Sequence, residues 1–149
     1  HFQTKTTIDT LDYSGDGLNE GSKVVIAAAG EIKRTLSEKI DKINLPDDFS
    51  NPKLISKGNL VIEGKGEIDE LISSLENQNL EGIGLITLVD DSDFTSKNFN
   101  NWLWVAFTRS NPANDIYGIN SETINKHFSC SVPIIDARIK SHHATVLER

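Results

Sequence analysis

The sequence predicts an α/β fold, a mainly parallel sheet with helices on both faces that forms a three-layer αβα sandwich. Short apolar runs alternate along the chain with segments whose apolar residues recur at helical spacing. Several of these runs are apolar on both faces, which is typical of strands inside a parallel sheet. The length of 149 residues fits one domain, so we expect residues 1–149 to form a single domain.

The first predicted strand and helix follow a polar N-terminal stretch. Residues 23–30 are apolar and end in glycine, which predicts a buried strand that leads into a turn. Residues 31–43 predict an amphipathic helix. Its apolar positions recur at intervals of four, four and three residues: Ile32, Leu36, Ile40 and Ile43.

The middle of the chain predicts two strands with a helix between them. Residues 59–63 and 83–89 are the strands, and the second has the strongest apolar pattern in the chain. The helix follows Gly66 and places four apolar residues on one face. These residues are Ile68, Leu71, Ile72 and Leu75.

An aromatic-rich helix is predicted over residues 99–109, with Ser96 or Asn98 as its N-cap. Strands are predicted at 115–119 and 133–139, whereas residues 121–129 fit neither pattern. We expect the helix to face inward through four of its residues, which are Phe99, Leu103, Ala106 and Phe107.

Composition excludes several classes of protein. The net charge of −7 argues against a nucleic-acid binder, which needs a basic patch. No apolar run approaches the ~20 residues of a membrane helix. The lone cysteine, Cys130, fits a reducing compartment, so we expect a cytoplasmic protein. The chain begins with His1 and has no methionine, and we interpret it as part of a longer protein.

Three carboxylates follow the predicted strand 83–89, namely Asp90, Asp91 and Asp93. Ligands of open α/β sheets bind at the carboxyl ends of strands, and clustered carboxylates suit magnesium. The alternative is that these aspartates cap the following helix and pair with arginines. Arg109 ends the aromatic helix within reach of them, and we expect it to form a structural ion pair.

Other motifs give weaker signals. Residues 12–17 resemble the start of a calcium loop, but the position of its bidentate glutamate is Lys23, so we expect a simple turn. Gly30 lies where phosphates bind in nucleotide-binding folds, although no glycine-rich fingerprint surrounds it. Trp102 and Trp104 cannot both face inward with Phe107, so we expect part of this aromatic surface to contact another domain or subunit.

Three segments together resemble the C-terminal region of UbiD-type carboxy-lyases. Residues 86–94 resemble the family's strand and Asp-rich turn, and 101–115 resemble its W-A-x-x-T-R-x-x-P-x-x-D segment. Residues 134–138 are similar to its late G-I-D-A-T segment, and 23–30 to the strand that opens the region. The chain departs from the late segment, because it has isoleucine for the glycine and arginine for the threonine.

The resemblance implies a non-oxidative decarboxylase of aromatic or α,β-unsaturated acids, in a family linked to quinone biosynthesis. The family uses prenylated FMN with a divalent metal (manganese or magnesium) and potassium. Its catalytic and metal-binding residues lie in the preceding flavin-binding region, so we expect none of them, and no cofactor, in this chain. The C-terminal domain of the family covers the active site and contributes to homo-oligomer contacts.

The leading hypothesis is therefore an assembly and active-site-covering domain, inactive alone, whose partner is the flavin-binding domain of the same chain. Asp90, Asp91, Asp93 and Arg109 are its candidate functional edge. One alternative is a stand-alone α/β domain that binds a small ligand or nucleotide at the Gly30 and Asp90 turns. Another is an interaction module built on the tryptophan surface.

Overall fold

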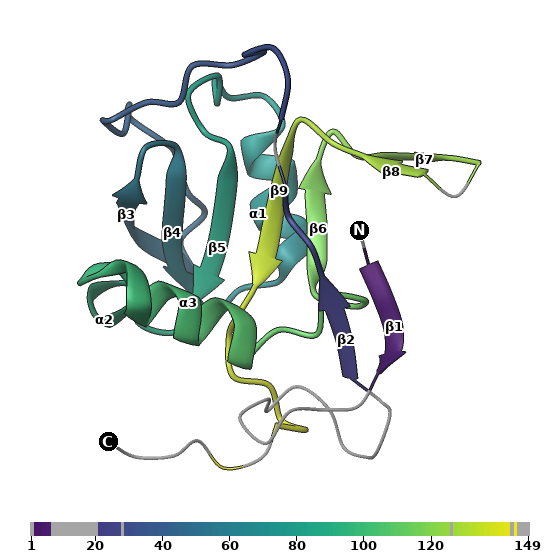
Figure 1. Ribbon diagram of the computed structural model, residues 1–149. Coiled ribbons are helices and arrows are strands. Elements are labelled where there is room, and N and C mark those ends of the chain that lie inside the picture. Colours follow the sequence, from purple (N-terminus) through teal and green to yellow (C-terminus); the bar gives the residue numbers. More distant parts are fainter. Residues whose placement is uncertain (1, 7–20, 28, 126, 144, 146–149) are drawn as a thin grey trace.

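The centre of the fold is a five-stranded sheet with the strand order β3-β4-β5-β9-β6 (Figure 1). The computed structural model describes residues 2–6, 21–27, 29–125, 127–143 and 145. The pairs β4/β5 and β5/β9 are parallel, whereas β3/β4 and β6/β9 are antiparallel. The strands are β3 (Phe49–Ser56), β4 (Asn59–Gly64), β5 (Leu85–Val89), β6 (Ile116–Ile119) and β9 (Val132–Asp136).

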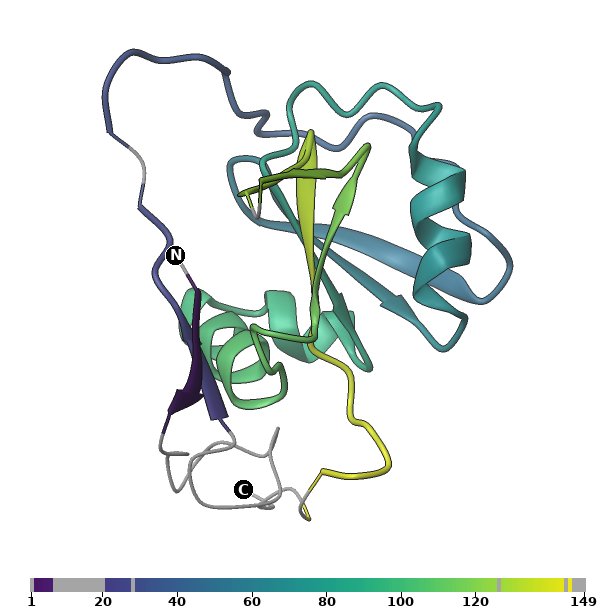
Figure 2. The same cartoon turned by 90° about the vertical axis from the view of Figure 1, so that its right-hand side faces the viewer.

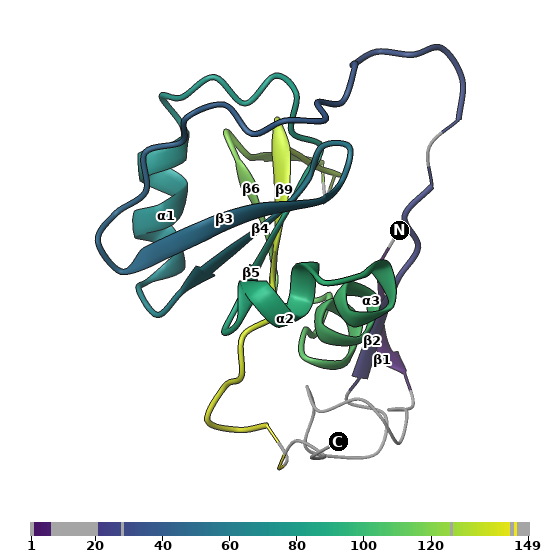
Figure 3. The ribbon, with the colours of Figure 1, turned by 90° about the vertical axis from the view of Figure 1, so that its left-hand side faces the viewer.

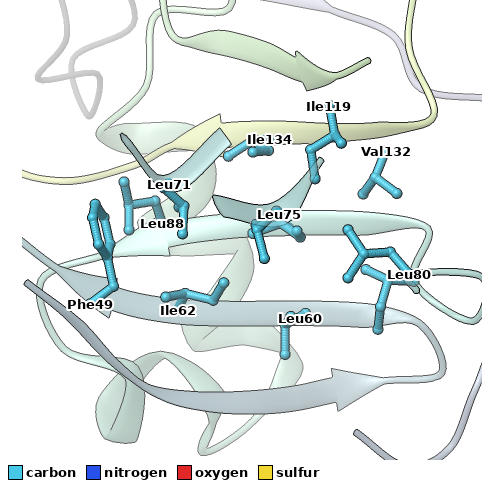
Figure 4. Packing of buried hydrophobic residues seen from close by; sticks show 12 residues of the cluster. Phe49, Leu60, Ile62, Leu71, Leu75, Leu80, Leu88, Ile119, Val132 and Ile134 are labelled. Carbon is cyan, nitrogen blue, oxygen red and sulfur yellow. The ribbon is translucent and has the colours of Figure 1, made fainter. Parts of the chain in front are cut away.

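One face of the sheet is covered by helix α1 (Ile68–Leu75), as its apolar spacing predicts. Alternate residues of a strand point to opposite faces, so every second residue of β4 and β5 contributes to this core. Leu71 and Leu75 of α1 are fully buried, and Figure 4 shows them among Ile62, Leu88 and Ile134. Among the residues that the structure describes, this core is the larger of the two buried apolar clusters.

The other face is covered by α3 (Phe99–Thr108), which follows the short helix α2 (Ser92–Ser96). Trp102 is buried against this face, and its indole Nε1–H donates a hydrogen bond of 2.9 Å to Thr87 Oγ1 in β5. Figures 1 and 3 show α2 and α3 on the side where the parallel strands β4, β5 and β9 end. The α/β prediction is confirmed, with helices packed on both faces; the sheet itself is mixed, with parallel pairs at its centre.

The prediction of which α3 residues face inward is wrong except for Ala106. Phe99, Leu103 and Phe107 are exposed, and Trp102 takes the buried position instead. The hydrogen bond of the indole to Thr87 and the burial of its large ring decide this rotation of the helix. The N-cap is Asn98 and not Ser96, because the Asn98 side-chain oxygen accepts a 2.9 Å hydrogen bond from the backbone N–H of Asn101.

The helix predicted over residues 31–43 is wrong, because this segment has no regular secondary structure. Ser37 instead pairs through its backbone with the sheet: its N–H donates to Gly82 O at 2.9 Å, and its carbonyl accepts from Gly58 N–H at 2.8 Å. Gly58 has a φ of +64°, and a Cβ there would lie 2.7 Å from Leu36 Cδ2. Tertiary pairing at these glycines therefore overrides the helical spacing.

The prediction of a buried strand over residues 23–30 is wrong. Strand β2 (Gly21–Val24) pairs with β1 (Phe2–Thr6) in a separate two-stranded sheet. The side chains of Val25 and Ile26, expected in a buried strand, are 65% and 64% exposed. The turn predicted at 12–17 lies outside the described residues.

Further elements appear where the sequence pattern gave no assignment, among them β1 and α2. Strand β3 (Phe49–Ser56) forms an antiparallel edge beside β4, and the pattern missed it because its side chains mix polar and apolar without alternation. Residues 121–129, for which the sequence gave no prediction, contain β7 (Glu122–Ile124) and β8 (His127–Ser129), which pair as antiparallel strands. Within the described part of the chain, no helix is both long and apolar enough to cross a membrane.

We predict that replacing Leu71 with alanine lowers the free energy of unfolding by about 3 kcal/mol, because it leaves a cavity in the larger core. Ser73→Ala is the matched control, since Ser73 is exposed on the same helix and its loss should change stability by no more than about 0.5 kcal/mol. Urea unfolding of both variants measures the difference. Equal effects would contradict the packing described for α1.

Candidate functional site

The carboxyl ends of β4, β5 and β9 meet at one edge of the sheet, because these three strands are parallel. A hollow of about 370 Å³ lies there, lined by residues 64–67, Asp90, Asp136 and residues 138–140. The first of these segments is the loop from β4 into α1. This is the edge at which open α/β sheets bind their ligands, so it is the candidate site.

Asp90 is the predicted carboxylate that lines this hollow. Its Oδ2 accepts a 2.8 Å hydrogen bond from the backbone N–H of Ile139 and lies 3.5 Å from Nη1 of Arg109. The ion pair expected for Arg109 is therefore with Asp90. Because Arg109 is the C-cap of α3, Asp90 connects that helix to the segment that follows β9.

Asp91 and Asp93 face other partners than Asp90. The Oδ1 of Asp91 accepts a 2.8 Å hydrogen bond from Phe94 N–H and so caps α2, which is the capping alternative from the sequence. Asp93 forms an exposed ion pair with Lys53 of β3. Among the described residues, no three His, Cys, Asp or Glu side chains gather closely enough to hold a metal ion.

Asp136 and Arg138 are the most tightly connected residues of this edge, and neither was predicted as a site residue from the sequence. Nε and Nη2 of Arg138 donate to the two carboxylate oxygens of Asp136, at 2.9 and 2.8 Å. Nη1 donates to Gly66 O at 2.6 Å, across to the loop before α1. The charged alternation Asp-x-Arg-x-Lys after a buried strand was the available signal, because such residues share one side of an extended chain.

Lys140 completes the charge balance. Its Nζ donates to Asp136 O at 3.0 Å and lies 3.4 Å from Oδ1 of Asp115. Asp115 is buried before β6, and its Oδ2 accepts a 2.6 Å hydrogen bond from Asn111 N–H. Three aspartates (Asp90, Asp115 and Asp136) thus pair with three cations (Arg109, Arg138 and Lys140).

The ionisation of Asp136 follows from these contacts. Burial alone would raise the pKa of its carboxyl, but the hydrogen bond from Arg138 and the charges of Lys140 and Arg138 outweigh burial and hold the pKa below its ordinary value. The same hydrogen bond is the main cause that raises the pKa of Arg138. Both groups therefore remain charged at neutral pH, as the bidentate geometry requires.

Charged side chains dominate the lining of the hollow, and the ion pairs among them suit this edge to positioning. None of the described residues that line the hollow supplies a hydroxyl, a thiol or an imidazole. The guanidinium of Arg138 already donates from all three of its nitrogens. Cys130 lies elsewhere, on the connection from β8 to β9, and burial raises the pKa of its thiol. The network thus holds residues 137–140 across the strand ends.

A larger hollow of about 500 Å³ lies between residues 32–43 and 79–83, where the chain enters β5. Arg34 fixes this segment, because its guanidinium donates to Ile83 O at 2.7 Å and Ser131 O at 2.9 Å. This is the opposite edge from the carboxyl ends. Gly30 follows no strand of the five-stranded sheet, so the ligand-binding alternative is wrong where it places the Gly30 turn and the Asp90 turn at one sheet edge.

Comparisons with known proteins find relatives in Chlamydia. The chain is 32% identical over 148 residues to a Chlamydia pneumoniae protein named as a subunit of 4-hydroxybenzoate decarboxylase, a match that covers 97% of the chain and 25% of that protein. It is 34% identical over 130 residues to an uncharacterized protein of Chlamydia muridarum, covering 87% of the chain and 22% of that protein. The chain thus spans about a quarter of these relatives. No family model and no solved structure matches it significantly.

We predict that Arg138→Met lowers the free energy of unfolding at pH 7 by about 3 kcal/mol, because it leaves a buried carboxylate without its main partner. Since Arg138 lowers the pKa of Asp136, the pair stabilises the fold above the ordinary aspartate pKa and loses this effect as the pH falls below about 4. The difference between wild type and variant should therefore shrink between pH 7 and pH 3 in urea unfolding.

Lys53→Met is the control for this measurement. It breaks the exposed ion pair with Asp93 and should cost less than about 1 kcal/mol. A cost for Arg138→Met that is equal at pH 7 and pH 3 would show that the aliphatic packing of Arg138, and not its charge, carries the effect.

Proposed function

We propose that this chain is a domain of a longer UbiD-type decarboxylase that acts on aromatic or α,β-unsaturated carboxylic acids. The observation that carries the proposal is the 32% identity, over 97% of the chain, to a protein named as a subunit of 4-hydroxybenzoate decarboxylase. The family resemblance of residues 86–94, 101–115 and 134–138, which is read from the same sequence, agrees with it. Their placement supports it further, because the first and last of these segments meet at the carboxyl edge of the sheet.

In this proposal the domain serves assembly and covers the active site, while catalysis belongs to a flavin-binding domain of the same chain. Prenylated FMN, with manganese or magnesium and potassium, supplies the chemistry of decarboxylation when bound there. The described residues of this chain do not offer a metal-ligand group of their own. In this proposal the domain contributes the position of the Asp90 turn and of residues 138–140 beside the active site.

The biological setting is part of the same proposal. A hydroxybenzoate-type substrate points to quinone biosynthesis, and we propose a cytoplasmic homo-oligomer. Asp90 contacts both Arg109, the C-cap of α3, and the backbone of Ile139. In this proposal these contacts transmit a change at α3 to residues 138–140, which lie beside the flavin-binding domain.

The decisive experiment is an assay of the longer protein, reconstituted with prenylated FMN and manganese, for release of carbon dioxide from 4-hydroxybenzoate and related acids. We expect turnover in the longer protein and none with residues 1–149 alone. A reconstituted longer protein that releases no carbon dioxide from any aromatic or unsaturated acid would refute the proposal.

Asp90→Asn in the longer protein tests the role of this edge. It removes the charge opposite Arg109 but keeps an oxygen for Ile139 N–H, and we expect turnover to fall about two- to thirtyfold, the range of typical coupling energies. The control is Glu38→Gln, the same change of charge in an exposed pair with Lys57, which should leave turnover unchanged. Equal turnover in both variants would show that the Asp90 edge does not contribute to catalysis.

A second candidate is a stand-alone domain that binds a small ligand or nucleotide, and the 370 Å³ hollow at the carboxyl edge favours it. It predicts that FMN or ATP raises the melting temperature of residues 1–149. The engagement of Arg138 by protein acceptors argues against an anionic ligand, so we expect no shift. A shift that depends on ligand concentration would favour this second candidate.

A further inference from the structure

Helix α3 has an apolar face that the described parts of the chain leave open to solvent. Phe99, Leu103 and Phe107 recur at intervals of four residues, which places them along one side of the helix. Their side chains are 51%, 39% and 37% exposed. We call these three residues the α3 stripe. Of the two tryptophans that the sequence suggested for such a contact, Trp102 is buried between α3 and the sheet, and Trp104 is half-buried against the second core.

The rest of the helix reinforces this observation. None of the ten residues from Phe99 to Thr108 is charged, although a quarter of the whole chain is. A helix that faces water normally carries charged residues on its outer side. Depletion of charged residues together with enrichment in aromatic residues is instead the composition of the core of a protein interface. The composition of the α3 stripe is therefore that of a surface which another protein segment covers.

We propose that the α3 stripe is the surface on which another part of the longer chain packs. This inference rests on the proposed function, in which the chain is one domain of a larger decarboxylase. The lengths of the relatives favour this occupant, because the region they share with this chain is only 22–25% of each of them. About three-quarters of such a protein thus lies outside this domain and is available to cover the stripe within the same molecule.

The position of α3 connects this contact to the carboxyl edge. The helix ends at its C-cap, Arg109, whose Nη1 lies 3.5 Å from Asp90 Oδ2. Figure 2 shows α3 on the side of the sheet away from α1, so a body that packs on the stripe approaches the second face of the sheet. Through this ion pair, a body that binds the α3 stripe can affect the position of Asp90. The stripe would then hold the domain in place, and the Asp90 edge would lie beside the active site.

The test compares maleimide labelling of single cysteines in a Cys130→Ser background, in residues 1–149 and in the longer protein. Leu103→Cys reports the α3 stripe, and Glu70→Cys reports an exposed position of α1 on the opposite face. We expect Leu103→Cys to react at least about tenfold more slowly in the longer protein, because interface cores exclude water. The rate at Glu70→Cys should stay the same within about twofold.

Other outcomes decide against the proposal. Equal labelling of Leu103→Cys in both proteins would show an open stripe and overturn it. Slow labelling in residues 1–149 that quickens on dilution would make the occupant a second copy of the domain, which also overturns it. Phe107→Ser guards against a labelling artefact. Its ring also packs edge-on against Trp102, so the variant should lower the melting temperature of residues 1–149 and should lower that of the longer protein more. Equal effects on both would count against the proposal.

The decarboxylase assay is independent of the labelling. A longer protein that decarboxylates but leaves the stripe open refutes the docking inference alone. A longer protein that protects the stripe but releases no carbon dioxide refutes the proposed activity alone and leaves the docking surface intact.

Discussion

The buried carboxylate at the end of β9 is the constraint on which the carboxyl edge depends. Asp136 is only 4% exposed, and a carboxylate so placed must be paired and hydrogen-bonded. Arg138 meets this need from two residues away and also reaches Gly66, so one side chain joins the end of β9 to the start of α1. The ion pair between Asp136 and Arg138, two residues apart, therefore helps to hold the ends of the parallel strands together.

The two faces of the sheet are completed to different degrees. The face under α1 is closed by that helix and by apolar residues of the irregular segment before β3. The other face has α3, an uncharged helix whose outer side remains apolar. This asymmetry is consistent with a domain that is stable through one core and uses the layer above the other for association, because an apolar layer open to water is otherwise unfavourable.

The sequence predicted the parts of the fold that depend on local periodicity and missed those that depend on strand order. The central strands and both long helices follow from apolar spacing. The segment around Leu36 reads as a helix, because its pairing with distant glycines is invisible in the spacing. The rotation of α3 depends on the bond from Trp102 to Thr87, and the pairing of Asp136 with Arg138 gains meaning only once β9 is known to lie beside β5.

The irregular segment before β3 has a consequence for the order of folding. Arg34 donates to Ile83 and to Ser131, which are 49 and 97 positions away along the chain. Ile83 precedes β5 and Ser131 precedes β9, so the two bonds bring together three segments that are distant along the chain. Contacts of such sequence separation form slowly, because a long loop must close first. We therefore expect this segment to join the entrance of β5 late in folding.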